Sequence, residues 1–334
     1  MGYSTGAKFT ADIIDDIANG LIATLDPIDG LPKWSDIIVA DPGATTWNTT
    51  TRTGNSARRA LRYLNGTETI YMALEVLNTS TQVKAYYSGG YTYYTQSKGI
   101  RITYSQSWDS VTHSYPVSNQ QSFVQFETNP YSAQNSNPSV YADLASLYVY
   151  YYLWIESNGF VIMGKPDVYS SDANQQSFIL VVERNPSKEY VDGYTNFYSF
   201  MWQNIFRGGY DSYSTARFRS VLRPFAYQYP DTGNYDDVTL SGAGISFVAM
   251  PSYYAYKSVG DNKVYYVKPL IHDVAGQNAP IFQGDLFFLW TEMVGLISGD
   301  VVAIEGTGKK YVCWGLDSPN HTQRITFAMK YASG

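Results

Sequence analysis

The chain is poor in cysteine, histidine and charge, and each shortage argues against a class of function. Its one cysteine, Cys313, excludes an intramolecular disulfide and any zinc site built from several cysteines. Cys313 lies in an apolar run, which predicts a small buried side chain. The histidines, His113, His272 and His321, stand far apart and have no partner at metal-ligand spacing. We therefore expect no catalytic residue, no metal and no cofactor.

Charged residues make up 16% of the sequence, against about 25% in a typical soluble domain. Ser, Thr, Asn and Gln fill many of the other polar positions, and a neighbouring protein can cover such a surface at a low desolvation cost. The net charge of −6 argues against general nucleic-acid binding, which needs a basic stripe. The longest apolar run, Leu144 to Ile155, is too short to span a bilayer, so we expect no membrane insertion.

Tyrosine is abundant instead, with 32 residues among 334. Its large ring and polar tip suit positions that are dry at one end and wet at the other, as at subunit interfaces. The candidate interface tyrosines lie in or beside polar stretches and are Tyr87, Tyr91, Tyr93, Tyr253 and Tyr254. Composition therefore predicts a protein that docks on others and is not an enzyme.

Hydrophobic periodicity predicts one helix near the N-terminus and strands elsewhere. Apolar residues recur at helical spacing from Phe9 to Leu25, and Pro27 ends the pattern. Apolar runs that are typical of strands follow at 70–76, 147–155, 160–163, 178–183, 197–202, 245–249, 263–270, 286–290, 301–304, 311–314 and 325–330. The prediction is a mainly β fold: antiparallel sandwich-like sheets with a short N-terminal α-helix and long loops.

Two glycine-containing turns predict β-hairpins. Asn158-Gly159 favours a type I′ turn, which needs positive φ at both central residues. The strand before it is hydrophobic on both faces, so we expect both faces to be covered, including the tyrosines from Tyr148 to Tyr152. Gly306-Thr-Gly308 predicts a second hairpin; it is not a Walker A loop, because Lys310 stands where Ser or Thr is required.

Long polar stretches separate the predicted strands, at Asp41 to Asn55, Tyr104 to Ser139 and Ser252 to Asp261. They are too long for ordinary hairpin loops, and we expect these arms and the N-terminal helix to lie against neighbouring subunits. The Ser-, Asn- and Pro-rich segment 132–139 suggests a division into an N-terminal helix plus β region at 1–140 and a β-rich domain at 141–334. A single domain is the alternative.

Arginine is the cation that proteins prefer for interfacial ion pairs. Arg58, Arg59 and Arg62 lie in a segment, Asn55 to Leu64, for which we predict one or two helical turns. In an acidic protein we expect them to pair with carboxylates of a neighbouring copy. The adjacent acids Asp15 and Asp16 point to different parts of a helix, so we interpret them as part of a solvated face and not as a catalytic pair.

Two other functions are consistent with this composition. Exposed aromatic side chains beside Asn, Gln and Asp can stack on sugars, which indicates a carbohydrate- or receptor-binding module and a possible host-surface glycan as ligand. Acid pairs such as Asp236-Asp237 suggest a cell-wall hydrolase, although adjacent acids in a Gly- and Asn-rich turn are more typical of a solvated loop.

The order of elements resembles that of structural proteins of tailed-bacteriophage virions, of the tail or baseplate type. The matching features are the helix from Phe9 to Leu25, a tryptophan after it (Trp34 or Trp47), the run Ile70-Tyr-Met-Ala-Leu74, the segment 151–165 (YYLWIESNGFVIMGK) and Tyr169. They cover about half of the chain. The sequence departs from the pattern at Gly159, where a basic residue is expected, and near Val312 to Leu316, which lacks the usual Tyr-Arg-Thr.

This resemblance implies a non-enzymatic structural subunit of a virion, assembled in the host cytoplasm, with copies of itself and other virion structural proteins as partners. The tail and baseplate are the expected positions, and a head or collar component, as at a head-tail connector, is the alternative. Families of this type offer no catalytic residues that could be assigned to positions here. The implied action is the burial of subunit interfaces.

Overall fold

The computed structural model describes residues 2–48, 57–66, 68–77, 82–86, 92–96, 99–114, 121–122, 148–166, 178–184, 197–207, 211–220, 270–273, 279–283, 287–290, 299–303, 306–316 and 325–331. These residues form one longer helix, α1 (Thr10–Ala23), two short helical turns, α2 (Ile37–Ala40) and η1 (Thr45–Trp47), and many strands. Every pair of neighbouring strands in this part of the chain is antiparallel. The predicted mainly β fold is confirmed.

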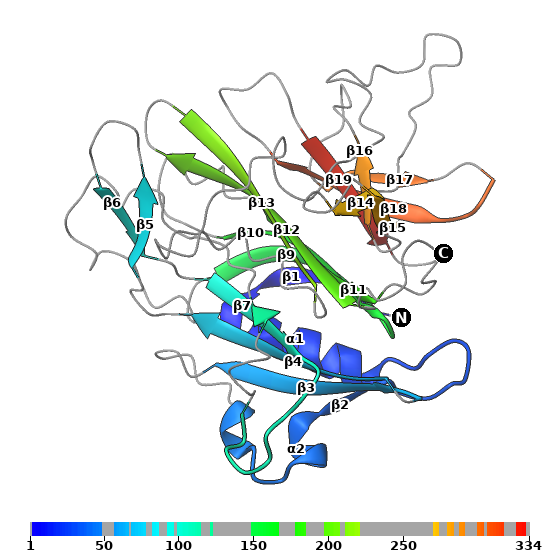
Figure 1. The fold of residues 1–334 in the computed structure, drawn as a ribbon. Coiled ribbons are helices and arrows are strands. Elements are labelled where there is room, and N and C mark those ends of the chain that lie inside the picture. Colours follow the sequence, from blue (N-terminus) through cyan, green and yellow to red (C-terminus); the bar gives the residue numbers. More distant parts are fainter. Residues whose placement is uncertain are drawn as a thin grey trace.

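Three larger sheets and two separate hairpins make up the β structure (Figure 1). The six-stranded sheet is ordered β1 (Gly2–Phe9), β9 (Tyr148–Glu156), β10 (Gly159–Pro166), β11 (Phe178–Arg184), β12 (Phe197–Arg207) and β13 (Asp211–Ser220). The five-stranded sheet is ordered β2 (Trp34–Asp36), β3 (Arg58–Asn65), β4 (Glu68–Leu77), β7 (Gly99–Ser105) and β8 (Gln121–Ser122). The four-stranded sheet is ordered β16 (Phe287–Trp290), β19 (Ile325–Tyr331), β18 (Lys310–Leu316) and β17 (Val301–Ala303). The separate hairpins are β5 (Gln82–Tyr86) with β6 (Thr92–Gln96), and β14 (Leu270–Asp273) with β15 (Ala279–Gln283).

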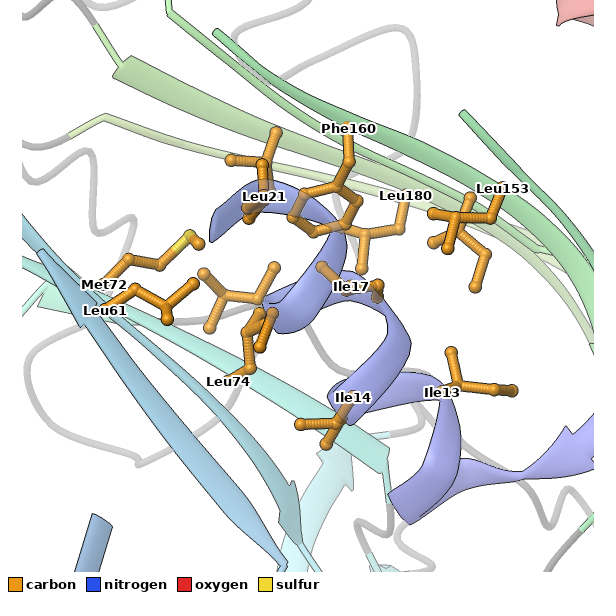
Figure 2. Close-up of a cluster of buried hydrophobic side chains, with 14 of the residues drawn as sticks. Ile13, Ile14, Ile17, Leu21, Leu61, Met72, Leu74, Leu153, Phe160 and Leu180 are labelled. Atoms are coloured by element: carbon orange, nitrogen blue, oxygen red, sulfur yellow. The ribbon is translucent and has the colours of Figure 1, made fainter. Parts of the chain in front are cut away.

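Helix α1 lies between the five-stranded and six-stranded sheets, as Figure 2 shows. Four residues of its apolar stripe, Ile13, Ile14, Ile17 and Leu21, are at most 1% exposed. A Cβ atom at Gly20 would overlap the side chain of Ile155, so glycine allows the helix to approach β9 closely. The expectation that this helix lies against a neighbouring subunit is therefore wrong, because the helix forms the centre of the chain's own core.

The same core draws on residues from both sides of position 140. Leu61, Met72 and Leu74 of the five-stranded sheet and Leu153 and Phe160 of the six-stranded sheet belong to one cluster (Figure 2). The segment that suggests a domain division, 132–139, lies outside the described residues. The division near residue 140 stays a prediction, and the described core spans it.

Strand β9 has one fully buried face and one partly covered face. Val149, Tyr151 and Leu153 face the core and are at most 1% exposed. On the other face Tyr152 meets Trp314 of the four-stranded sheet edge to face, with ring centroids 5.4 Å apart. Tyr150 on that face is 49% exposed. The prediction that both faces are covered is thus wrong at Tyr150.

The β9–β10 hairpin is confirmed, but its turn differs from the predicted one. Glu156 pairs with Gly159, so Ser157 and Asn158 are the two loop residues. Asn158 does not have positive φ, whereas Gly159 has φ of 152°, so this is not a type I′ turn at Asn158-Gly159. A side chain at Gly159 would overlap the carbonyl oxygen of Val182 on β11, which explains the glycine by close packing.

Most other predicted strands are confirmed to within a few residues. The confirmed segments are 70–76, 160–163, 178–183, 197–202, 286–290, 301–304, 311–314 and 325–330. Those at 245–249 and, except for Leu270, 263–270 lie outside the described residues. The sequence pattern does not predict strands β1, β2, β3, β5 to β8 and β15. Strand β3 begins at Arg58, where the pattern predicts a helical turn. Strand β7 contains Tyr104, where the pattern predicts the start of a polar arm.

Candidate functional site

The predicted arginine segment is strand β3, so the expected helical turns are wrong. Arg59 points to the inner face of the five-stranded sheet, where its Nη1 donates to Asp15 Oδ1 at 2.6 Å and to Asn19 Oδ1 at 3.1 Å. Its Nη2 donates to Asp36 Oδ2 at 2.8 Å. Arg59 is 6% exposed, so these bonds are well shielded from water. It therefore joins α1 to β2 and β3 within the chain, and the expected pairing with a neighbouring copy is wrong for Arg59.

Asp15 and Asp16 also differ from the predicted solvated face. Asp15 pairs with Arg59, and Asp16 accepts from Lys8 Nζ at 2.6 Å and from the Tyr151 hydroxyl at 3.0 Å. The hydrogen bond to Asp16 raises the pKa of Lys8. These acids therefore connect the start of α1 to β1, β3 and β9. They do not form a catalytic pair, because they point to different partners.

Arg58 and Arg62 lie on the opposite face of β3. The Arg58 guanidinium lies over the Trp47 ring, 4.4 Å from its centroid, and its Nε donates to the Thr46 carbonyl at 2.6 Å. Arg62 is half-buried, and its Nε has no hydrogen-bond partner among the described residues. Arg58 is thus held by its own chain, while the pairing of Arg62 with a neighbour stays a prediction.

An aromatic cluster covers this outer face of the five-stranded sheet. Trp47 meets Trp108 edge to face at 5.8 Å, and Tyr71 of β4 stacks on Trp108 at 6.1 Å. Beneath them lie the small buried side chains of Ala44 and Ala60. Large rings fit here because alanines on the sheet and loop leave room for them. The cluster therefore covers the face of the sheet that points away from α1.

Asp41 ties two loops of this cluster together. Trp108 Nε1 donates to Asp41 Oδ2 at 2.7 Å, and His113 Nδ1 lies 2.8 Å from the same oxygen. Trp47 Nε1 donates to the His113 carbonyl at 2.7 Å. The bonds from His113 and Trp108, with that from the Gly43 amide, lower the pKa of Asp41. The described parts of two predicted arms, residues 41–48 and 105–114, thus pack on each other, and their contact with a neighbouring subunit stays a prediction.

The Asp41–His113 pair contains two members of a catalytic triad but not the third. Among the described residues, no nucleophile is hydrogen-bonded to the other ring nitrogen of His113. The sequence Gly2-Tyr-Ser-Thr-Gly6 matches the Gly-x-Ser-x-Gly motif of hydrolases. Ser4 lies within strand β1, opposite Leu153, and not on the sharp strand-to-helix turn that this motif requires. The geometry therefore identifies this pentapeptide as part of an edge strand and not as the turn that carries a catalytic serine.

Three exposed large apolar residues lie in the loop of residues 25–33, between α1 and β2. Ile28 is 93% exposed, Leu31 59% and Leu25 55%. Leu64 of β3, whose amide donates to the Lys33 carbonyl, adds a fourth aliphatic side chain and is 44% exposed. In Figure 1 this blue loop projects from the molecule beside the end of the β3–β4 hairpin. Clustered exposed aliphatic side chains are typical of interaction sites.

Hydrogen bonds fix the conformation of the 25–33 loop. The Asp26 amide donates to the Leu31 carbonyl at 2.9 Å, and the Gly30 amide donates to the Asp26 carbonyl at 2.8 Å. The Ile28 amide donates to Asp26 Oδ1 at 2.8 Å. Asp29 pairs with Lys33 and accepts from the Leu31 amide, and both bonds lower the pKa of Asp29. The aliphatic side chains are thus presented on a preorganised loop, which reduces the entropy lost on binding.

Of the candidate interface tyrosines, Tyr93 alone lies among the described residues. Tyr93 lies in β6, opposite Ala85 of β5. Tyr87, Tyr91, Tyr253 and Tyr254 lie outside the described residues. Their role at an interface stays a prediction. Sequence reasoning did not single out Ile28 and Leu31, although both stand in a Pro- and Gly-containing turn, where large aliphatic residues are unusual.

The described residues also provide evidence on three other functions: metal binding, membrane crossing and thiol chemistry. They contain no group of three or more His, Cys, Asp or Glu side chains that could hold a metal ion. None of their helices is long and apolar enough to cross a membrane. Cys313 is buried, as predicted, and burial raises the pKa of its thiol to about 12. A thiol of this kind is a poor nucleophile.

No family model matches the sequence, and no curated protein is significantly similar to it.

Proposed function

We propose that this chain is a non-enzymatic structural subunit of a bacteriophage virion, in the tail or baseplate, that acts by assembling with copies of itself and with other virion proteins. The observation that carries the proposal is the preorganised 25–33 loop, on which Ile28 is 93% exposed. A chain with few charges that holds large aliphatic side chains in water on a fixed loop is suited to docking.

The fold also supports the part of the proposal that depends on the resemblance. The central hairpin meets the tryptophan and the loop that follow the helix, although 123 residues separate Trp34 from Ser157. Trp34 Nε1 donates to the Ser157 carbonyl at 2.9 Å, and the Ser157 hydroxyl donates to Asp26 at 3.3 Å. Trp34 also packs edge to face on Tyr63 at 5.1 Å. The elements of the resemblance therefore form one structural unit that also carries the exposed loop.

Two measurements test this proposal. Sedimentation of the full chain over a wide concentration range should show association, and mass spectrometry of intact particles of the encoding phage should find the chain in multiple copies. Cross-linking within the particle would then separate the tail or baseplate from a head or collar position. A chain that stays monomeric at high concentration and is missing from intact particles would rule the proposal out.

Carbohydrate or receptor binding stays the alternative prediction. Stacking on a sugar needs a free aromatic face. In the aromatic cluster, Arg58 lies over Trp47, and Tyr71 stacks on Trp108. The cluster therefore favours a structural role for these three rings, and we rest the proposed function on the 25–33 loop.

A further inference from the structure

Three asparagines in the chain are followed directly by glycine: Asn19, Asn65 and Asn158. Asparagine before glycine is chemically labile, because the next amide nitrogen can attack the side-chain carbonyl carbon and glycine has no Cβ atom to hinder the approach. The attack needs rotation about the Cα–C bond of the asparagine and a glycine amide that is not held in a hydrogen bond. The fold places the three pairs in three different environments.

Asn19-Gly20 lies within helix α1, where each amide donates to the carbonyl four residues earlier. Arg59 Nη1 donates to Asn19 Oδ1 at 3.1 Å, and a Cβ atom at Gly20 would overlap the side chain of Ile155. Rotation at Asn19 would therefore break the helix at the centre of the core. This pair can react only when the core opens.

Asn158-Gly159 lies where β9 turns into β10. Gly159 is buried and pairs with Glu156 of β9 on one side and with Glu183 of β11 on the other. The Asn158 carbonyl accepts a hydrogen bond from the Arg184 amide at 2.7 Å. Rotation at Asn158 would therefore disturb the contacts of this turn with two neighbouring strands.

Asn65-Gly66 lies at the free end of the β3–β4 hairpin, beside the 25–33 loop in Figure 1. Asn65 is the last residue of β3 and pairs with Glu68. Within the described residues, β2 pairs with β3 only as far as Tyr63, and β7 pairs with β4 only from Tyr71 onward. Asn65 therefore has a strand partner on one side only, and fraying of this last pair is enough to free it.

The glycine of this pair is also open to the reaction. Gly66 is exposed and has φ of 61°. Apart from its chain neighbours, no atom lies within 4 Å of the place where a Cβ atom would stand. Its amide donates to no carbonyl among the described residues. The nitrogen that must attack is thus neither bonded nor covered.

We propose that Asn65 is the site at which the folded chain deamidates. The Gly66 nitrogen attacks Asn65 Cγ, the bond from Cγ to the side-chain nitrogen breaks, and ammonia leaves with the proton of the Gly66 amide. Water then opens the succinimide ring at either carbonyl, which yields aspartate or isoaspartate and a new negative charge. The reaction needs no partner protein, so it is independent of the proposed function.

The product changes the surface beside it. Isoaspartate carries the main chain through its side-chain carboxyl carbon, which lengthens the chain by a methylene group at the end of β3. The preceding residue, Leu64, donates its amide to the Lys33 carbonyl at 2.9 Å and so ties the hairpin end to the 25–33 loop. The conversion therefore alters the edge of the exposed aliphatic surface.

Peptide mapping of the full chain tests the proposal without any substitution. The folded protein and a sample unfolded in guanidinium chloride are held in the same mildly alkaline buffer, and mass spectrometry follows the conversion of each asparagine. In the folded protein Asn65 should convert at least about tenfold faster than Asn19 and Asn158, because those two need a wider opening of the structure. In denaturant the three rates should lie within about threefold of one another, because glycine follows each asparagine.

Two variants provide a second measurement. Anion-exchange chromatography of the aged wild type should show a new acidic species, and Asn65→Gln should abolish it, because glutamine would have to close a larger ring. Asn158→Gln is the matched control and should form that species at the wild-type rate, while thermal melting should show that both variants fold. If Asn19 or Asn158 converts as fast as Asn65 in the folded protein, or if Asn65 converts only in denaturant, the proposal is wrong. Neither result would affect the proposed function.

Discussion

The two faces of the five-stranded sheet are covered in different ways. On the inner face, Leu61, Met72 and Leu74 pack against the aliphatic stripe of α1. On the outer face, Trp47 and Trp108 are oriented by hydrogen bonds to His113 and Asp41. The first cover is a regular element with a long apolar stripe. The second is built from two loops that have no periodic pattern.

The two covers contribute differently to the stability of the sheet and to the conformation of the loops. Burying an aliphatic side chain contributes about 1.5–3 kcal/mol, so the inner face supplies most of the stabilisation of the sheet. A neutral hydrogen bond contributes about 1 kcal/mol net and one to a charged group, such as the Asp41 carboxylate, about 1.5–3 kcal/mol, and each fixes the orientation of a ring. The outer face therefore defines the loop conformations more than it stabilises the sheet. Substitutions on the inner face should therefore change the free energy of unfolding more than substitutions on the outer face.

Truncation of the inner face should have the largest effect. Ile17 is 0% exposed and lies between both sheets in Figure 2. Ile17→Ala leaves a cavity there and should lower the free energy of unfolding by about 2–5 kcal/mol, measured by urea denaturation. Ile28→Ala is the matched control, because that side chain is 93% exposed and its loss should cost less than about 0.5 kcal/mol. Equal effects of the two changes would contradict the view that α1 is the centre of the core.

The helix and the long strands could be predicted from the sequence because their packing follows a period. Ile13, Ile14, Ile17 and Leu21 recur at helical spacing, and that spacing is the stripe that both sheets bury. Strand β9 alternates in the same predictable manner. The position of the helix between the sheets could not be predicted, because periodicity shows which face is buried and not which element covers it.

The missed features depend on contacts between distant residues. Strand β1 has the sequence GYSTGAKF, which has no apolar alternation, and it is positioned by its pairing with β9. Arg59 reaches Asp15 and Asp36, which are 44 and 23 residues away. Asp41 and His113 are 72 residues apart. No local sequence pattern predicts pairs of residues that are so far apart. From the sequence alone, the partner expected for Arg59 is therefore a carboxylate of a neighbouring copy.

Removal of the Arg59 cation should have the next largest effect. Arg59→Met keeps much of the side-chain volume but leaves Asp15 and Asp36 without their shared partner. Because Asp15 can regain some water, we expect a loss of about 2–3 kcal/mol in unfolding free energy, below the range for a fully buried pair. Arg58→Met should cost about 0.5–1 kcal/mol, since Arg58 makes one cation–π contact with Trp47 and one exposed hydrogen bond to the Thr46 carbonyl. If chemical denaturation ranks the two variants in the opposite order, Arg59 does not join α1 to the sheet as described.

The smallest effect should come from protonation of Asp41 on the outer face. The folded protein lowers the pKa of this carboxyl below its ordinary value of 3.8, chiefly through the hydrogen bond from His113 and then through that from Trp108. A lowered folded pKa stabilises the protein above the unfolded pKa, and this contribution is lost as the pH falls from about 4 through the lower folded value. Asp41→Asn cannot titrate, so its unfolding free energy should fall less steeply than that of the wild type over this range. Denaturation at a series of pH values measures both slopes. Ile28→Ala, which alters no charge, should keep the wild-type slope, and an equally steep fall in Asp41→Asn would show that Asp41 does not hold the two loops through its charge.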